Sequence, residues 1–390
     1  AAGGDFAAKA ERYRAAIAEK RRLTKMLREK NYAKVTGAGA VVIDGEASFI
    51  DTHTIRIVSA DGEQRVTAER IFINTGALPF VPPISGAAES THVYTSETMM
   101  ELDELPEKLV IIGGGYIGLE FASYYANFGS SVAIVQDGDT FIPREDREIA
   151  ARVMQQMNDR GIHILTGAKI LRIEDSAVGT DVIVQTKDGE KTLAANAVLV
   201  ATGRRPNIDG LNLAAAGVAV TERGAIAIDE HLRTNVPHIW AMGDVAGGLQ
   251  FTYISLDDFR IVKDQLVGTG ARTTANRGAV PYAVFLDPPL SRVGMTEEEA
   301  QAAGFDVRVT RLEVAAIPKA QVYKKPAGVL KAIIDVKTDT ILGAHFFCPE
   351  SQEMINLIKM AIDHGITAAA LGSAIYTHPT MTEALNDLFG

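Results

Sequence analysis

Three glycines, Gly113, Gly115 and Gly118, have a spacing that could serve chemistry. They form a G-x-G-x-x-G pattern within "GGGYIG", after the apolar run "LVII" and before the helix-like run "YIGLEFASYYANFG". In a strand, loop and helix of this kind the first glycine permits a tight turn, the second lets a pyrophosphate approach the backbone, and the third lets the helix pack closely. We therefore predict a dinucleotide-binding loop; a glycine-rich turn without a ligand is the alternative.

The residue that would select between the two nicotinamide dinucleotides is Gln136, at the end of the next strand, "SVAIVQ". An acid at this position hydrogen-bonds the 2′-hydroxyl of NAD, whereas a nearby arginine accommodates the 2′-phosphate of NADP. Asp137 and Asp139 would repel a phosphate, and Arg144 would attract one if its loop folds back. The sequence favours NADH and leaves the use of NADPH open.

Two further segments indicate a second nucleotide. "FINTGALP" and "LVATGRRPN" each end an apolar strand in Thr-Gly, at Thr75-Gly76 and Thr202-Gly203, which predicts two domains of similar plan. In "IWAMGDV", Asp244 follows Gly243 at the end of a strand, where a carboxylate can accept a hydrogen bond from a sugar or ribityl hydroxyl. A helix N-cap is an alternative role for Asp244.

The tail "IYTHPTMTEAL" contains His378 and Glu383, five residues apart. Pro379 could open a helix at its first turn, with Thr380 or Thr382 near its start. A histidine whose second ring nitrogen meets a carboxylate has a fixed tautomer and a raised basicity, so His378 and Glu383 could act as a general acid-base pair. A solvent-exposed or core histidine without a catalytic role is the alternative.

The elements that must position these residues follow from periodicity. Apolar residues at helical spacing predict a long amphipathic helix from Asp5 to Asn31. Alternating segments with Asp-Gly turns predict an antiparallel meander that leads into a buried strand, Ile71 to Asn74, and then a proline-rich exit, "ALPFVPPISG". From Thr91 to Gly210, strands and helices alternate around the glycine loop as in a doubly wound nucleotide domain. The strands "YAVFL", "VLKAIIDV" and "TILGAHFFC" and the helix "SQEMINLIKMAIDHG" predict an α+β tail.

Composition excludes several classes of function. The chain has 390 residues and a formal net charge of −10, with its lysines and arginines largely dispersed, which argues against a nucleic-acid partner. A membrane span and a secretory signal are both absent from the sequence pattern, so we predict a cytoplasmic protein. Cys348 is the single cysteine, which excludes an internal disulfide and a cysteine-based metal cluster in this sequence; we predict no metal site.

In collinear order, "GGGYIGLEFA", "ATGRRPN", "AMGDV", "SRVGMTEEEA", "LGAHF" and "THPTMTEAL" resemble the pyridine nucleotide-disulfide oxidoreductase family, which includes lipoamide dehydrogenase, glutathione reductase and mercuric reductase. The resemblance implies an α/β fold with two Rossmann-like nucleotide-binding domains, for FAD and NAD(P), and a C-terminal α+β dimerisation domain. It implies the remainder of the FAD domain at 1–90, the NAD(P) domain at 91–210, a return to the FAD domain at 211–275, and the dimerisation domain at 276–390.

The resemblance also assigns residues. The loop residues Gly113, Gly115, Tyr116, Ile117 and Gly118 would hold NADH or NADPH, with Tyr116 as the ring that gates the nicotinamide pocket. The other residues implied for NAD(P) are Glu120, Gln136, Gly203 and Arg204; those for FAD are Thr75, Gly76, Gly243 and Asp244. His378 and Glu383 would be the acid-base pair, presented across the interface of an obligate homodimer to the partner's flavin.

Two departures from the family matter. Its members begin with a strand, a glycine loop for the ADP half of FAD and two redox cysteines four residues apart, and this sequence contains neither feature. The simplest account is a chain shown without its first several dozen residues; if the protein truly starts at Ala1, a non-catalytic NAD-binding dimeric scaffold is the alternative. The chain also lacks the vicinal C-terminal cysteines of mercuric reductase, and Cys348 is expected to be a buried small hydrophobe.

The predicted function is therefore an FAD-dependent NAD(P)H oxidoreductase. Hydride would pass through the flavin, and a cysteine pair outside this chain, to a small-molecule oxidant. Longer runs such as "IWAMGDVAGGLQFTYISLDD" and "PPLSRVGMTEEEA" resemble a branch of the family that acts in resistance to reactive chlorine. That resemblance implies an oxidised sulfur or reactive-chlorine-derived acceptor such as hypothiocyanous acid. A dihydrolipoamide dehydrogenase or a mercuric-reductase-like enzyme is the alternative.

Overall fold

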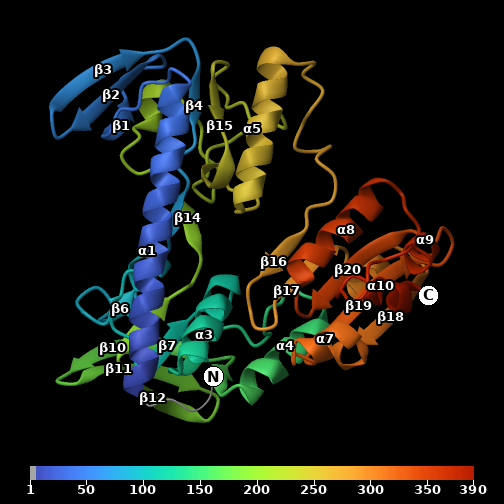
Figure 1. The fold of residues 1–390 in the computed structure, drawn as a ribbon. Helices are drawn as coiled ribbons and strands as arrows, with labels where there is room; N and C mark the ends of the chain where they lie inside the picture. Colours follow the sequence, from blue (N-terminus) through green and yellow to red (C-terminus); the bar gives the residue numbers. More distant parts are fainter. Residues whose placement is uncertain (1–5) are drawn as a thin grey trace. The chain divides into compact units, whose positions relative to one another are not determined.

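The computed structural model describes residues 6–390, which divide into two compact units (Figure 1). The first unit comprises the described part of Ala1–Ile17 together with Val81–Thr202 and Gly278–Gly390. The second unit comprises Ala18–Phe80 and Gly203–Arg277. Each unit is therefore assembled from segments that are far apart in the sequence.

The long N-terminal helix is present and is longer than predicted. Helix α1 spans Phe6–Gly37, while Asp5, the first residue of the predicted helix, lies outside the described residues. Tyr13 and Ile17 are buried in the core of the first unit, and the Tyr13 hydroxyl donates to the carbonyl oxygen of Leu102 at 2.8 Å. The part of α1 before Ala18 is thus anchored in the first unit by its apolar residues.

A parallel sheet with the strand order β6-β13-β7-β8-β9 lies at the centre of the first unit. Its strands are β6 (Val93–Tyr94), β7 (Lys108–Ile112), β8 (Ser131–Val135), β9 (Ile162–Leu165) and β13 (Ala197–Val200). Helix α3 (Tyr116–Phe128) connects β7 to β8, and helix α4 (Arg147–Asp159) connects β8 to β9. Parallel neighbours need such crossovers, so the doubly wound plan predicted from the alternating pattern is confirmed.

Two smaller features complete this part of the unit. The short helix α2 (Ser96–Met99) follows β6. An antiparallel sheet of β10 (Lys169–Ser176), β11 (Gly179–Thr186) and β12 (Gly189–Ala195) is inserted between β9 and β13. Its buried residues, including Val182 and Val184, share a core with Val110, Val198 and other residues of the parallel sheet.

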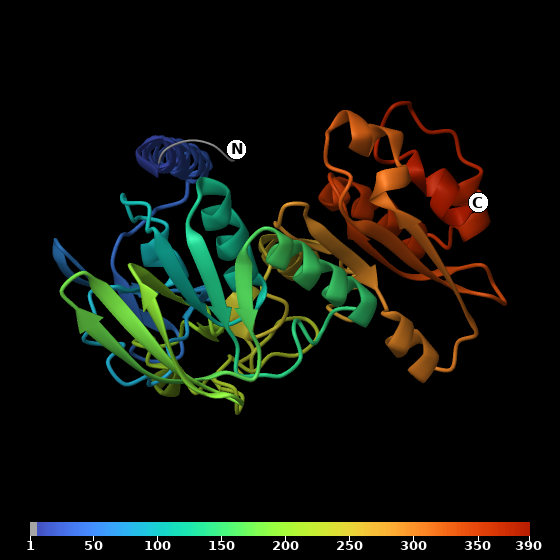
Figure 2. The ribbon, with the colours of Figure 1, turned by 90° about the horizontal axis from the view of Figure 1, so that it is seen from below.

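The tail of the first unit is an antiparallel sheet covered by helices (Figure 2). Its strands, in the order β16-β17-β20-β19-β18, are β16 (Tyr282–Val284), β17 (Leu290–Gly294), β18 (Val307–Glu313), β19 (Val329–Asp335) and β20 (Ile341–Phe347). The helical elements are α6 (Glu297–Ala302), η3 (Val314–Ala316), α7 (Pro318–Val322), α8 (Ser351–Asp363), α9 (Ala368–Gly372) and α10 (Ala384–Phe389). The α+β tail is confirmed, and β17 and β18 are additional to the three predicted strands.

Cys348 follows β20 and is fully buried in the apolar core of this tail. Burial raises the pKa of its thiol, so the reactive thiolate is disfavoured. The prediction that Cys348 is a small hydrophobe is confirmed.

The second unit contains the predicted meander. Strands β1 (Glu46–Phe49), β2 (Thr54–Ser59) and β3 (Gly62–Thr67) pair antiparallel, and β4 (Ile71–Ile73) pairs in parallel with β15 (Ile239–Ala241). Its remaining elements are β5 (Ala77–Pro79), β14 (Arg204–Pro206), η1 (Leu213–Ala216), η2 (Gly243–Ala246) and α5 (Thr252–Val267).

The segment "ALPFVPPISG", predicted to be a proline-rich exit, contains the boundary between the two units, which falls after Phe80. Its first residues form β5, which pairs antiparallel with β14. This pairing joins segments about 127 residues apart, so no local pattern signals it.

Among the described residues, no helix has both the length and the apolar composition that a membrane crossing requires.

Candidate functional site

The glycine loop adopts a conformation that two of its glycines make possible. Gly113 has φ of +110°, and a Cβ at this position would lie 2.4 Å from the carbonyl oxygen of Ala201. A Cβ on Gly118 would lie 2.1 Å from the carbonyl oxygen of Gly113, so a side chain would separate α3 from the loop. Gly113 and Gly118 are therefore required by the turn and by the packing of the helix.

Gly115 has a different role. It is the N-cap of α3 with φ of −80°, it is exposed, and a Cβ built on it would have no atom within 4 Å. No side chain caps this helix, so among the described residues the cap contributes no side-chain acceptor to the amides of the first turn. An open cradle of backbone donors at a helix N-terminus fits the pyrophosphate of a dinucleotide.

The amide of Gln136 has a fixed orientation. Its Nε2 donates to the carbonyl oxygens of Gly138 and Thr140, both at 2.8 Å, because only an amide nitrogen can satisfy two carbonyl acceptors. Its Oε1 therefore points the other way and lies beside Gly114, where a Cβ would be 2.3 Å from it. The face of Gln136 toward the loop is a hydrogen-bond acceptor, which suits a ribose hydroxyl better than a phosphate.

The acidic residues near Gln136 also favour a ribose hydroxyl over a phosphate at this position. Asp137 accepts a hydrogen bond from the backbone of Gly138, and Oδ1 of Asp139 lies 2.5 Å from the position of a Cβ on Gly167. Arg144 is exposed, and its carbonyl oxygen accepts a hydrogen bond from Arg292, which ties the Arg144 backbone to β17. The turn after β8 thus places two carboxylates next to Gln136.

Tyr116, Ile117 and Glu120 lie in the first turns of α3, and the structure gives two of them long-range partners. The Tyr116 hydroxyl donates to Oε1 of Glu145 at 2.5 Å, and the Tyr282 hydroxyl donates to the same oxygen at 2.6 Å. Oε1 of Glu120 accepts from the backbone N–H of Phe285 at 2.9 Å, and burial raises the pKa of Glu120. Ile117 is half-buried beside them.

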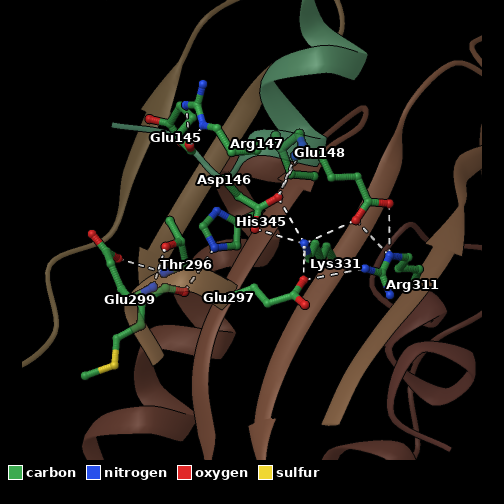
Figure 3. A network of polar contacts seen from close by, with 12 residues as sticks. Glu145, Asp146, Arg147, Glu148, Thr296, Glu297, Glu299, Arg311, Lys331 and His345 are labelled. Carbon is green, nitrogen blue, oxygen red and sulfur yellow. Dashed lines mark hydrogen bonds and ion pairs between the residues drawn. The ribbon is translucent and has the colours of Figure 1, made fainter. Parts of the chain in front are cut away.

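Next to this cluster lies a buried ionic network centred on Lys331 of β19 (Figure 3). The Lys331 side chain is 3% exposed, and its Nζ lies 2.9 Å from Asp146, 3.1 Å from Glu148 and 2.8 Å from Glu297. Asp146 is also the N-cap of α4, and Arg311 binds Glu148 at 2.8 Å. The network links the loop after β8 to the tail sheet within the first unit.

These charges shift the acid-base equilibria of their neighbours. Burial by itself would raise the pKa of Asp146, but the hydrogen bonds and charge of Lys331 outweigh it and leave the pKa lowered. Burial, together with the nearby Arg292, lowers the pKa of His345 to about 4, and its Nε2 donates to the carbonyl oxygen of Met295. His345 is therefore a neutral core residue at neutral pH.

His378 and Glu383 are brought together in the tail of the first unit. Nδ1 of His378 lies 2.7 Å from Oε2 of Glu383, with the histidine side chain 71% exposed and the glutamate 18% exposed. Because a carboxylate only accepts, Nδ1 carries the hydrogen and the exposed Nε2 is left as the free acceptor. The other oxygen of Glu383 accepts from the backbone of Thr380, whose hydroxyl in turn accepts from the Glu383 N–H.

The predicted helix start is wrong. Pro379 follows a cis peptide bond with His378 and opens no helix, and α10 begins at Ala384 with Glu383 as its N-cap. The segment before α10 is a turn closed by the reciprocal bonds of Thr380 and Glu383, a local arrangement that competes with helix formation. Thr382 lies in that turn, ahead of the helix.

In the second unit, the Thr-Gly pair and Asp244 lie at the carboxyl ends of the paired strands β4 and β15. The Thr75 hydroxyl donates to the carbonyl oxygen of Asn207 at 2.6 Å, and Gly76 has φ of +74° with no atom near its Cβ position. A Cβ on Gly243 would meet Oδ1 of Asn74 at 2.7 Å, so the two loops are adjacent. This edge of parallel strands is where an α/β sheet binds a nucleotide.

Asp244 is not a helix N-cap. Met242 occupies the N-cap of η2, and Asp244 lies inside that turn, half-buried, and its carboxylate accepts no hydrogen bond from the described part of the chain. The free carboxylate fits a sugar or ribityl hydroxyl, and the backbone N–H of Gly243 is already held by Asp258 at 2.8 Å. The residues of this edge thus fit part of a flavin nucleotide.

Gly203 and Arg204 also belong to the second unit, not to the unit that contains the glycine loop. Gly203 has φ of +123°, and Arg204 pairs with Pro79 and donates to the carbonyl oxygen of Ala77. Arg204 lines a surface pocket together with Pro206, Thr221, Glu222, Arg223, Ala225, Ala246, Gly247 and Gln250. The predicted site residues therefore lie in both units: the glycine-loop residues and the separate His378–Glu383 pair in the first, and Thr75, Gly76, Gly203, Arg204, Gly243 and Asp244 in the second.

The sequence reasoning missed Glu145, Tyr282 and Lys331. Glu145 is 2% exposed although it stands among the charged residues of "PREDRE", and Lys331 lies in the otherwise apolar strand "VLKAIID". A charge within an apolar strand is the signal that could have marked Lys331, since an unpaired lysine is rarely buried. Tyr282 carries no local signal, because its partners come from distant segments.

The fold and the glycine loop define a dinucleotide-binding α/β protein with an antiparallel tail domain. Residues 5–258 match the pyridine nucleotide-disulphide oxidoreductase family, and residues 280–389 match the dimerisation domain of that family. The chain belongs to the pyridine nucleotide-disulphide oxidoreductase family. It is an NAD(P)H-dependent oxidoreductase of a family that binds FAD, as the motifs predicted.

Individual proteins that resemble this chain support the same family assignment. The chain is 49% identical to the probable pyridine nucleotide-disulfide oxidoreductase RclA of Escherichia coli (strain K12) over 96% of this chain and 84% of that protein. It is 33% identical to a mercuric reductase of Staphylococcus aureus over 93% of this chain and 65% of the reductase. The solved structure of the HOCl-induced flavoprotein disulfide reductase RclA from Escherichia coli superposes with a TM-score of 0.93 at 47% identity, covering 98% of this chain and 88% of that one.

The predicted fold class is confirmed by these matches, and the dimerisation domain supports a homodimer.

Proposed function

We propose that the chain oxidises NADH in order to reduce a small oxidised-sulfur or reactive-chlorine-derived molecule such as hypothiocyanous acid. The balanced reaction converts hypothiocyanous acid and NADH into thiocyanate, NAD⁺ and water, so two electrons and the hydride hydrogen leave the nicotinamide. The 49% identity to RclA of Escherichia coli, and the description of that protein as an HOCl-induced disulfide reductase, support this class of acceptor.

The observation that carries the proposal is the open cradle at Gly115, where the N-terminus of α3 has no side-chain cap and no atom fills the Cβ position. Gly113, Gly115 and Gly118 would hold the pyrophosphate of NADH, with Ile117 in the first turn. Oε1 of Gln136 would accept a hydrogen bond from the 2′-hydroxyl of the ribose, which favours NADH over NADPH. Tyr116 and Glu120 would border the nicotinamide.

FAD, when bound, would accept the hydride and pass on two electrons. Thr75, Gly76, Gly243 and Asp244 would hold it, with the free Asp244 carboxylate accepting from a ribityl hydroxyl. In this assignment 1–90 and 211–275 form the FAD domain, 91–210 the NAD(P) domain and 276–390 the dimerisation domain. His378 would take up or deliver a proton at Nε2 while Glu383 holds Nδ1–H, and the homodimer would present this pair to the partner's flavin.

The proposed function is tested by following the nicotinamide absorbance when the protein is mixed with hypothiocyanite and either NADH or NADPH. We expect stoichiometric oxidation of the nucleotide, with kcat/KM for NADH about tenfold above that for NADPH, a difference of about 1.4 kcal/mol. Faster NAD⁺ reduction with dihydrolipoamide would instead identify a dihydrolipoamide dehydrogenase. Nucleotide binding without consumption of any oxidant would identify a non-catalytic scaffold.

Replacing Gly115 by alanine is expected to weaken NADH binding roughly 10- to 100-fold, the value of one hydrogen bond to a charged group. The new methyl group would meet no protein atom, so it would occupy only the space through which the pyrophosphate approaches. Stability should fall by only about 0.5–1 kcal/mol, because alanine is a poorer N-cap than glycine. Calorimetric titration with NADH and a urea unfolding curve measure the two effects separately.

Gly113→Ala is the matched control. Its backbone strain at φ of +110° and its clash with Ala201 should cost about 1–3 kcal/mol of stability before any ligand is added. If Gly115→Ala bound NADH as tightly as the unchanged chain, the cradle would not be the pyrophosphate site.

A further inference from the structure

Two adjacent aspartates of α5, Asp257 and Asp258, are buried in the second unit. They are 9% and 4% exposed, on a helix that packs apolar residues against β15 (Figure 1). A buried carboxylate needs a partner, because a charge that leaves water without one is costly. Nη2 of Arg277 donates to Oδ1 of Asp258 at 2.8 Å, and Nε of Arg277 lies 3.4 Å from Oδ2 of Asp257. Asp257 also accepts a hydrogen bond from Arg272, so two aspartates and two arginines form a charge-balanced group, called here the aspartate–arginine cluster.

The second carboxylate oxygen of Asp258 holds the backbone of a distant loop. Oδ2 accepts from the backbone N–H of Gly243 at 2.8 Å, across 15 positions of the sequence. Gly243 is the first residue of η2 and has φ of +69°. The side chain of Asp258 thus fixes the peptide group at the point where the chain passes from β15 into η2.

Asp244, the next residue, depends on this backbone for its position. Its carboxylate accepts no hydrogen bond from the described part of the chain, so no protein donor holds the side chain in place. Its carbonyl oxygen accepts from the N–H of Gly247 at 3.1 Å, which closes the turn. Because glycine has wide conformational freedom, a Gly243 without its acceptor would let the Asp244 side chain change direction.

We propose that Asp258 and Arg277 are positioning residues for the flavin nucleotide. Asp258 holds the Gly243 N–H so that the Asp244 carboxylate faces a ribityl hydroxyl, and Arg277 supplies the positive charge that keeps Asp258 in place. This inference rests on the proposed binding of FAD by Asp244. If Asp258 only stabilised the fold, its loss would affect FAD binding whether or not Asp244 is present; a positioning role requires that the effect pass through Asp244.

The test compares two double variants that leave no charge at either position. The amide variant, Asp258→Asn with Arg277→Gln, keeps an acceptor oxygen for the Gly243 N–H, and the asparagine nitrogen can donate to the glutamine. The apolar variant, Asp258→Leu with Arg277→Met, removes that acceptor. Replacing both partners of a buried ion pair is often neutral for stability, and Asp257 keeps Arg272 in both variants, so both should fold.

FAD binding to the whole chain is followed by the change in flavin fluorescence. We expect the amide variant to bind FAD within about twofold of the unchanged chain, and the apolar variant about 3- to 10-fold more weakly, the range of one lost hydrogen bond. When Asp244→Ala is added to both variants, this difference should vanish. NADH affinity should be the same in both variants, because the glycine loop belongs to the first unit.

Amide hydrogen exchange of the turn Gly243–Ala246, measured without flavin, gives an independent readout. Exchange should be faster in the apolar variant than in the amide variant, because only the amide variant keeps the acceptor of the Gly243 N–H. Equal exchange, equal FAD affinities, or a difference in FAD affinity that persists with Asp244→Ala would overturn the inference alone. If the unchanged chain bound no FAD, the proposed flavin site would be overturned and the inference with it.

Discussion

Replacing His378 by alanine is expected to lower turnover with the oxidant by about 10²- to 10⁴-fold, the usual contribution of a positioned general acid or base. The imidazole is the exposed member of its pair, and its Nε2 is the atom left free to exchange a proton. Removing it leaves Glu383 with the backbone of Thr380 as its remaining partner, so the turn before α10 should persist. Steady-state rates with saturating NADH measure the loss.

The affinity for NADH separates this effect from a general loss of structure. His378 has no contact with the glycine loop among the described interactions, so NADH titration should give the same Kd in the variant and the unchanged chain. His364→Ala is the matched control, because it removes an exposed histidine of the same tail domain, at the C-terminal end of α8. If His378→Ala kept more than about a third of the turnover, the pair would not carry the proton transfer.

Glu383→Gln probes the second member of the pair. The amide oxygen can still accept the Nδ1 hydrogen, so the tautomer is kept while the negative charge is lost. We therefore expect a smaller loss than in His378→Ala, since orientation is preserved and only the stabilisation of the charged imidazole is removed.

The parts of the site that the sequence predicted are those whose physical cause is local. Gly113 and Gly118 are dictated by a turn and a helix contact within a few residues, and His378 and Glu383 are five residues apart. The alternating pattern around the loop also identified the parallel sheet, because buried strands and amphipathic helices have different periods. The family motifs added the assignments of Tyr116 and Glu120.

The rest depended on tertiary contacts that no local pattern encodes. Glu145 meets Tyr282 across 137 positions of the sequence, and Lys331 meets Asp146 across 185. The start of α10 was predicted too early because a proline is compatible with a first helical turn, whereas here the turn is closed by Thr380 and Glu383. Likewise the fixed face of Gln136 depends on the carbonyl oxygens of its own turn, which only the folded backbone places.

Replacing Lys331 by methionine is expected to destabilise the protein by about 3–5 kcal/mol, the cost of breaking a buried ion pair from one side. The lysine is the cation at the centre of Asp146, Glu148 and Glu297, and methionine has a similar length but no charge. Asp146 would then remain buried without its cation, while Glu148 would keep Arg311. Urea unfolding measures the loss, and Arg311→Met, which removes an exposed cation of the same network, should cost only about 0–1 kcal/mol.

The pH dependence of the stability that Lys331→Met loses gives a second, independent test of the role of this ion pair. In the unchanged chain the pKa values of Asp146 and Glu148 are lowered, so the stability they contribute is present above their ordinary values near pH 4 and is lost as the pH falls below them. The pKa of Lys331 is raised, so its contribution is full below about pH 10 and is lost only at higher pH. In Lys331→Met, burial without the lysine should raise the pKa of Asp146, so this variant should gain stability as Asp146 becomes protonated. The difference in the free energy of unfolding between the unchanged chain and Lys331→Met should therefore be largest near neutral pH and shrink toward pH 4. If this difference were constant across the range, lost packing and not the unpaired carboxylate would be responsible.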